Sequence, residues 1–300
     1  MASTPTDKTP SDKTMASPAI PFGVACLGIA FFSAMDAVVK GLALEMGAYN
    51  ALFWRSLVGL LFSGTLYLAS RSALPSRTAW RLHVMRGSIS AVMAFTFFWG
   101  IARVPLAEGI ALSFISPIIA LYLASVFLGE SVGRSAITAS ALGFAGVIVI
   151  ASGRIGSNFS ADALWGIGAI LISAVFYAAN LVLMRLQAQA AGPFEIAFAL
   201  NSIVVVILAA FAPAYAVLPP AESWPMISFA AALTIASLLL LSWAYARAQA
   251  QHLLPVEYTA FIWASLFGYL LFDEHVTIFA VAGTALIIAG CVVVARDKAT

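Results

Sequence analysis

The sequence predicts an all-α integral membrane protein with ten transmembrane helices, arranged as two inverted five-helix repeats. Of its 300 residues, 62% are hydrophobic and 9% are charged, against roughly a quarter charged in ordinary soluble proteins. The gaps between charged residues hold spans of about 20 apolar residues, enough to cross a hydrocarbon core of roughly 30 Å. A third observation, an internal match at a constant offset, indicates the repeats. The lipid bilayer is therefore the first expected partner.

The order of the elements follows from apolar runs between polar or turn-forming breaks. Residues 1–19 are rich in Ser, Thr and Pro with balanced charges, which predicts a disordered cytoplasmic tail. Short connections join the helices that follow. The predicted helices are 20–40, 48–69, 80–102, 106–128, 135–152, 163–185, 194–212, 226–247, 253–272 and 276–295.

The distribution of Lys and Arg predicts the orientation, since this bias sets membrane topology. With both termini in the cytoplasm, ten basic residues lie in cytoplasmic segments and three on the opposite side. The ten are Lys8, Lys13, Arg71, Arg77, Arg81, Arg134, Arg185, Arg247, Arg296 and Lys298, and the three are Lys40, Arg103 and Arg154. Arg55 and Arg86 complete the fifteen and lie inside predicted spans.

The repeat is visible at a constant offset of 144 residues. The matched pairs are Trp99 with Trp243, Ala102 with Ala246, Arg103 with Arg247, Glu130 with Glu274, Val132 with Val276 and Gly146 with Gly290. This match divides the chain into a first repeat at 20–152 and a second at 163–295. Because five is odd, the second copy enters the membrane from the opposite side. Inverted repeats are the physical basis of alternating access, so the pattern indicates a transporter.

The stretch from Arg86 to Glu130 opens with RG, contains FTFFW and Pro117, and closes with LGE. Together with LGES after helix four, FDEH after helix nine and the duplication, it resembles the repeated unit of the drug/metabolite transporter superfamily, in its ten-helix EamA-type branch. The resemblance covers about residues 20 to 295. It implies a secondary carrier in the bacterial inner membrane, most similar to amino-acid exporters, including exporters of aromatic amino acids.

The second copy departs from the family pattern in two places. It has FDE where the first copy has LGE, and Phe261 stands at the position of Pro117. Helix nine is therefore expected to lack the kink of helix four, and symmetric gating by these two helices is not expected.

Two predicted helices that correspond under the repeat carry polar stripes at helical spacing. The stripes are Ser33, Asp36 and Lys40 on helix one and Tyr177, Asn180 and Met184 on helix six. Polar stripes inside a span face a cavity or a neighbouring helix rather than lipid. Asp36, Tyr177 and Asn180 are candidates for a substrate cavity. The alternative is hydrogen bonding between helices, with Asp36 and Lys40 as an i,i+4 pair and Lys40 able to snorkel.

Arg55 lies in predicted helix two, where facing lipid would cost about 2.5–3.5 kcal/mol on insertion scales. It needs a partner or water. Two interpretations stay open: it attracts a substrate carboxylate, or it pairs structurally with Asp36 or with carbonyl groups at a helix end. Arg86, near the cytoplasmic end of helix three, is interpreted as a snorkelling anchor.

Helix four places Ser113, Ser116 and Pro117 on one face. A proline near mid-span frees a backbone carbonyl, so this face is a candidate for substrate binding or gating, with a simple packing kink as the alternative. Four aromatic residues suit an apolar or aromatic substrate side chain, although aromatics near span ends also form the interfacial belt. They are Trp99, Tyr245, Tyr258 and Trp263.

Several classes are disfavoured. The sequence has no HExxH, no GxSxG paired with a histidine and no GxxxxGK[ST] loop, so neither an intramembrane enzyme nor an ATP-driven pump is expected. No catalytic residue, metal or cofactor is expected, and a net charge of +2 from dispersed residues gives no nucleic-acid patch. A proton-coupled carrier needs a carboxylate well inside the membrane, and Asp36 is the best candidate.

The sequence therefore predicts a secondary transporter that exports amino acids by alternating access, with a small molecule as its substrate. The alternative within carriers is a nucleotide-sugar or other metabolite exchanger, although clustered Lys and Arg for a phosphate-rich substrate are lacking. A channel or membrane scaffold would explain the spans but not the inverted duplication. The oligomeric state is left open and a monomer is compatible with the sequence.

Overall fold

The computed structural model describes residues 19–70, 75–116, 118–120, 122–123, 134–153, 161–245, 256 and 259–297. Helix occurs in each of the ten predicted ranges, and the described residues contain no strand. The longer helices are α1 (Ala19–Ala69), α2 (Arg77–Ile101), α5 (Arg134–Ser152), α6 (Ala161–Ala190), α7 (Pro193–Ala209), α9 (Trp224–Tyr245), α11 (Thr259–Phe272) and α12 (Ile278–Asp297), and the short ones are α3 (Leu106–Ser113), α8 (Ala212–Tyr215) and η1 (Ala221–Ser223). The all-α prediction is confirmed.

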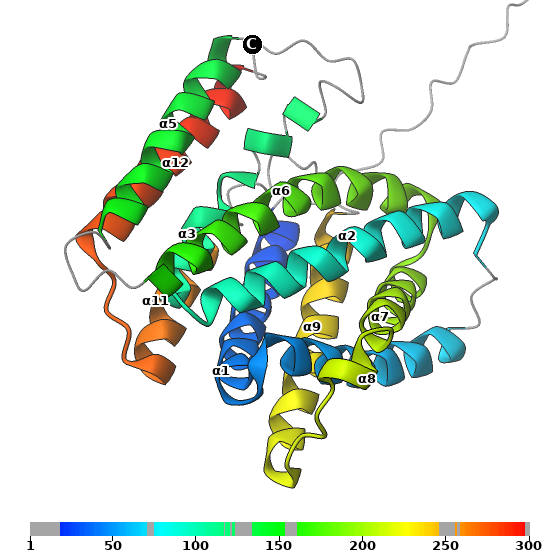
Figure 1. Cartoon of the computed structure of the whole chain (residues 1–300). Coiled ribbons are helices and arrows are strands. Elements are labelled where there is room, and N and C mark those ends of the chain that lie inside the picture. Colours follow the sequence, from blue (N-terminus) through cyan, green and yellow to red (C-terminus); the bar gives the residue numbers. More distant parts are fainter. Residues whose placement is uncertain are drawn as a thin grey trace, which may run out of the picture.

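Helix α1 contains two of the predicted spans joined by one residue. Its 51 residues would extend about 75 Å as one straight helix, more than twice the hydrocarbon core. The break is at Gly47, whose φ of 83° and ψ of 151° are not helical. This backbone conformation is essentially restricted to glycine. The ribbon of α1 turns sharply between its two halves, and the second half runs crosswise to the first in this view (Figure 1), so the chain changes direction without a loop.

The helix ends have local causes in the sequence. Ser76 precedes α2 with extended backbone, and its hydroxyl accepts a hydrogen bond from the Ala79 backbone N–H, satisfying a donor that the first turn leaves open. Pro193 occupies the first turn of α7. Backbone N–H groups in a first turn have no acceptor within the helix, so a proline there costs no hydrogen bond. These signals place the start of each helix within three residues of the predicted boundary.

The main packing pairs follow the internal repeat. Helix α1 packs along α9, and α2 packs along α6, which is the corresponding pair 144 residues away. Helices α5 and α12 correspond to each other and lie side by side (Figure 1). Their backbones meet at Gly146 and Gly283. A Cβ atom added to either glycine would lie 2.6 Å from the carbonyl oxygen of the other, which is too close for a side chain. Such close approach through small residues is typical of membrane helices.

The exterior is as apolar as the interior. Leu68, Trp165, Ile262 and Ile278 are each at least 66% exposed, while Leu52, Ile101 and Ile170 are fully buried. Among the described residues, four helical stretches are long and apolar enough to cross a membrane, and five shorter apolar helices accompany them. An exterior of this kind is stable when hydrocarbon, not water, is the solvent.

Candidate substrate site

The most unusual buried group is the carboxylate of Asp36, in the middle of the first half of α1. It is 1% exposed, and neither of its carboxylate oxygens has a hydrogen-bond partner among the described residues. A buried ionised carboxylate without donors is strongly disfavoured. Helix packing alone therefore does not account for a carboxylate at position 36, and a bound ligand or a proton would stabilise it.

Arg55 lies beside Asp36 but is held by other groups. One terminal guanidinium nitrogen, Nη1, donates to Thr234 Oγ1 at 3.0 Å and lies 3.4 Å from Met35 Sδ. The guanidinium also lies over the Phe98 ring, 5.7 Å from its centroid. Arg55 and Asp36 interact electrostatically, yet the two side chains form neither an ion pair nor a hydrogen bond in the described part of the chain. Arg55 Nε is buried without a partner.

Several buried hydroxyls lie on α1 and α9, the helices that carry the two charges and their partner Thr234. Met35 and Thr234 meet at Arg55, and Gly28 lies against Leu241. These contacts indicate that α1 and α9 run antiparallel, with Ser33 opposite residue 236 and so one position from Ser237. The hydroxyls of Ser33, Ser56 and Ser237 are buried and have no hydrogen-bond partner among the described residues. The Asp36 site is the name used below for Ser33, Asp36, Arg55, Ser56, Thr234 and Ser237.

A second buried polar group, the Arg86 network, joins α2 to α6 and α7. Arg86 Nε donates to Asn180 Oδ1 at 2.7 Å, and its Nη1 donates to Gln187 Oε1. His83 contacts Gln187 through one ring nitrogen and Glu195 Oε1 at 2.9 Å through the other. Arg86 is 5% exposed. The snorkelling interpretation of Arg86 is therefore wrong, because its guanidinium is satisfied inside the bundle.

The network also accounts for the predicted stripe on α6. The Asn180 amide nitrogen donates to Ser90 Oγ at 3.0 Å, so both ends of that amide are occupied. Tyr177 lies within electrostatic reach of Arg86. These contacts are the hydrogen bonding between helices that the sequence left as an alternative to a cavity.

The end of the bundle away from the Arg86 network has an ion pair between Lys40 and Glu274. Lys40 Nζ also donates to the Val104 carbonyl at 2.8 Å, and Glu274 Oε2 accepts the Leu106 backbone N–H at 2.8 Å. Lys40 is 3% exposed, so it does not snorkel. The Lys40–Glu274 clasp ties α1 and the start of α3 to the segment between α11 and α12.

The remaining predicted residues lie away from these charges. Ser113 and Ser116 donate to carbonyls of their own helix, Gly109 O at 3.0 Å and Ser113 O at 2.6 Å. The Arg103 guanidinium lies over the Trp99 ring, 3.5 Å from its centroid. Trp263 stacks on Phe267 with 6.2 Å between ring centroids. Pro117, Tyr258 and the side chain of Tyr245 lie outside the described residues.

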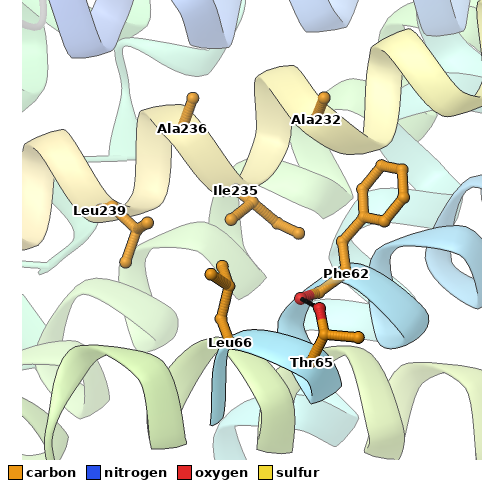
Figure 2. A pocket seen from close by; sticks show the side chains of 7 residues that line it. All are labelled: Phe62, Thr65, Leu66, Ala232, Ile235, Ala236 and Leu239. Carbon is orange, nitrogen blue, oxygen red and sulfur yellow. Dashed lines mark hydrogen bonds between the residues drawn. The ribbon is translucent and has the colours of Figure 1, made fainter. Parts of the chain in front are cut away.

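An open apolar groove of about 370 Å³ runs between the second half of α1 and α9. The groove is lined by Phe62, Thr65 and Leu66 of α1 and by Ala232, Ile235, Ala236 and Leu239 of α9. Figure 2 shows Ile235 and Leu239 extending toward the α1 side chains. The Thr65 hydroxyl donates to the Phe62 carbonyl at 2.8 Å and so offers the groove no free donor. The groove does not include the Asp36 site, and its lining matches hydrocarbon rather than a polar substrate.

Sequence reasoning missed Thr234, Ser237 and the partner role of Glu274. Thr234 and Ser237 are three residues apart on one face of a hydrophobic helix. This is the same spacing as that of Ser33 and Asp36, so a signal did exist for them. Glu274 stood in the FDEH motif, but its partner Lys40 is 234 residues away. A signal did exist for Arg86, since an arginine inside a span requires partners.

Apolar helices with an apolar exterior, together with buried charged groups such as Asp36, Lys40 and Arg86 inside the bundle, are typical of a multi-span membrane transporter. The chain belongs to the EamA-like transporter family, which matches it twice, at residues 21–152 and 164–296. These segments agree with the two predicted repeats to within one residue at each boundary. The superfamily resemblance is confirmed, and the chain is a transporter, not an enzyme.

The relatives have different substrates in their names. The pseudopaline exporter of Pseudomonas aeruginosa (strain UCBPP-PA14) is 26% identical over 270 residues, 89% of this chain and 93% of the relative. The riboflavin transporter of Rhizobium johnstonii (strain DSM 114642 / LMG 32736 / 3841) is 27% identical over 276 residues, 90% of this chain and 89% of the relative. A solved crystal structure superposes with a TM-score of 0.63 at 18% identity, over 96% of this chain and all of the other, which supports the fold.

Proposed function

We propose that this transporter exports amino acids, or closely related small zwitterions, across the bacterial inner membrane. The observation that carries the proposal is the presence of one acidic and one basic side chain, Asp36 and Arg55, at the Asp36 site without an ion pair between them. Asp36 offers a carboxylate with no donors, and Arg55 offers a guanidinium whose Nε is unused. An amino acid presents an ammonium and a carboxylate that complement these two groups.

The surroundings support a small, mostly apolar substrate. The Phe98 ring lies against the Arg55 guanidinium. The hydroxyls of Ser33, Ser56 and Ser237 are buried on the same helices and have no hydrogen-bond partner among the described residues. A nucleotide sugar needs several cations for its phosphates. Two of the basic groups within the bundle, Arg86 and Lys40, are already bonded to protein groups. The alternative of a nucleotide-sugar exchanger is therefore less well supported, and a channel has no use for a buried unpaired carboxylate.

The proposed arrangement has two inverted repeats, 20–152 and 163–295, that rock around the site, with both termini in the cytoplasm. The distribution of Lys and Arg, ten residues against three, supports this orientation. Reactivity of single cysteines at the two termini and at residue 154 with an impermeant reagent tests the orientation.

The test of the function is counterflow in proteoliposomes that contain the full chain, loaded with a mixture of amino acids and with no pH gradient. Uptake of labelled phenylalanine, threonine and methionine is followed in turn, and protein-free liposomes serve as the control. Saturable accumulation of one or more of them is the expected result. Folded protein that accumulates none of them would sink the proposal and redirect the search to other metabolites.

A further inference from the structure

We infer that Asp36 is an exchangeable proton site, and that the proton it carries in the empty transporter is released when the substrate ammonium binds, one proton for each zwitterion. This inference rests on the proposed function and deepens it. It supplies the coupling ion that an exporter working against a gradient requires.

The first step is the state of the empty site. Asp36 is 1% exposed, and within the described part of the chain no backbone or side-chain donor forms a hydrogen bond with either carboxylate oxygen. Ionised carboxylates in proteins are stabilised by such donors or by a paired cation, and without them the neutral acid is the cheaper form. The proton provides the missing stabilisation when no ligand is present.

The second step concerns the neighbouring charges. Among the described residues, Arg55 interacts electrostatically with Asp36. Its Nη1 donates to Thr234 and lies near Met35, and no hydrogen bond joins the guanidinium to the carboxylate. Lys40, one turn along α1, is directed to Glu274 and the Val104 carbonyl. The neighbouring helices bring further titratable groups that are engaged elsewhere: His83 and Arg86 of α2 and Glu195 of α7 belong to the Arg86 network, and Tyr269 of α11 is 54% exposed.

The third step is stoichiometry. Other described carboxylates near the bundle lie at helix ends and have partners. Examples are Glu108 in the first turn of α3, Glu195 in the first turn of α7 and Glu274 after α11. The residue corresponding to Asp36 in the second repeat is Asn180, a neutral amide bonded at both ends. Asp36 thus has no acidic counterpart in the second repeat, and the inferred stoichiometry is one proton for each substrate molecule.

The cycle balances as follows. When the site is open to the outside, the Asp36 carboxylate loses the substrate ammonium and takes a proton from water. When the site is open to the cytoplasm, the carboxylic acid returns that proton to water and the carboxylate binds the next ammonium. A neutral zwitterion leaves and one positive charge enters, so each cycle moves one net charge inward.

The experiment uses the full chain in proteoliposomes with an entrapped pH dye, and compares the wild-type chain with Asp36→Asn, Asp36→Glu and the control Asp162→Asn. Asp162 is a 68% exposed acid at the start of α6, paired with Arg103 outside the Asp36 site. Asp36→Asn resembles the neutral acid in shape and charge, so it is expected to fold. Addition of phenylalanine, threonine or methionine is expected to move protons in the wild-type chain, in Asp36→Glu and in the control. Asp36→Asn should reduce this flux at least tenfold.

Two results would overturn the inference and leave the proposed function standing. One is counterflow by the wild-type chain without substrate-dependent proton movement; the other is proton movement that persists in Asp36→Asn. Absence of counterflow by folded wild-type chain overturns both. Infrared difference spectroscopy adds a readout independent of transport: the empty protein at neutral pH should show a carboxylic-acid band that Asp36→Asn lacks, and absence of that band refutes the protonated state.

Discussion

The Lys40–Glu274 clasp allows a sharp prediction, because its two partners differ in burial. Lys40 is 3% exposed and the Glu274 side chain is 19% exposed. Glu274→Ala leaves an ammonium inside the bundle with the Val104 carbonyl, and breaking a buried pair in this way costs about 3–5 kcal/mol. Lys40→Met leaves a carboxylate that reaches solvent and retains the Leu106 N–H, a loss of about 1–3 kcal/mol.

The double variant separates pairing from packing. Lys40→Met with Glu274→Ala removes both charges, so no isolated ion is left inside the bundle. It should be more stable than Glu274→Ala alone by about 1–2 kcal/mol, since the two residues form one network and their effects are not additive. Methionine is also what the repeat has at the corresponding position, Met184.

The assay is thermal unfolding of the purified, detergent-solubilised chain for the wild type, both single variants and the double variant. The matched control is Asp162→Ala, which breaks the exposed Arg103–Asp162 pair and should change stability by less than about 1 kcal/mol. A double variant whose loss equals the sum of the two single losses would refute the reasoning, since the residues would then act independently.

Three further variants test other parts of the structure. Arg55→Ala should weaken amino-acid affinity at least tenfold, while Arg55→Lys should retain part of the affinity. The measurement is the concentration dependence of counterflow. If both variants have the same affinity and Arg55→Ala has reduced thermal stability, the role of Arg55 is structural. Asn180→Leu removes the acceptor of Arg86 Nε and the donor to Ser90 Oγ, while Arg86 keeps Gln187. It should lower stability by about 2–4 kcal/mol, and an unchanged unfolding temperature would contradict the network. Gly47→Ala has no steric clash, yet its backbone at φ 83° should cost about 1–3 kcal/mol, and a neutral effect in the same assay would show that the bend adapts.

The sequence was sufficient for the helices because the apolar runs and their breaks are local signals. Gly47, for instance, interrupts the apolar pattern at the bend in α1. The duplication was equally visible, since Trp99 and Trp243, or Glu130 and Glu274, occupy one register. Asp36 and Arg55 were recognisable as candidates because isolated charges in spans require an explanation.

Partners could not be predicted in the same way. A pair between Lys40 and Asp36 one turn away was one alternative from the sequence, but Lys40 pairs with Glu274, because the fold brings the segment after α11 close to Lys40. Arg86 could not be distinguished from an interfacial anchor until α6 was seen to cover it with Asn180 and Gln187. Contacts between residues some hundred or more positions apart depend on how the helices pack, which hydropathy does not encode.

The bend at Gly47 has a mechanical consequence. With one residue between the two halves of α1, no loop can absorb a tilt of the first half, which packs against α9 and carries Asp36. Any such tilt must either be transmitted as a lever to the second half, which carries Arg55, or be taken up as rotation about the φ and ψ of Gly47. The distance between the Asp36 carboxylate and the Arg55 guanidinium is therefore coupled directly to the tilt of the first half of α1. A rocking motion that changes the bend angle at Gly47 changes the affinity for a zwitterion together with access to the site.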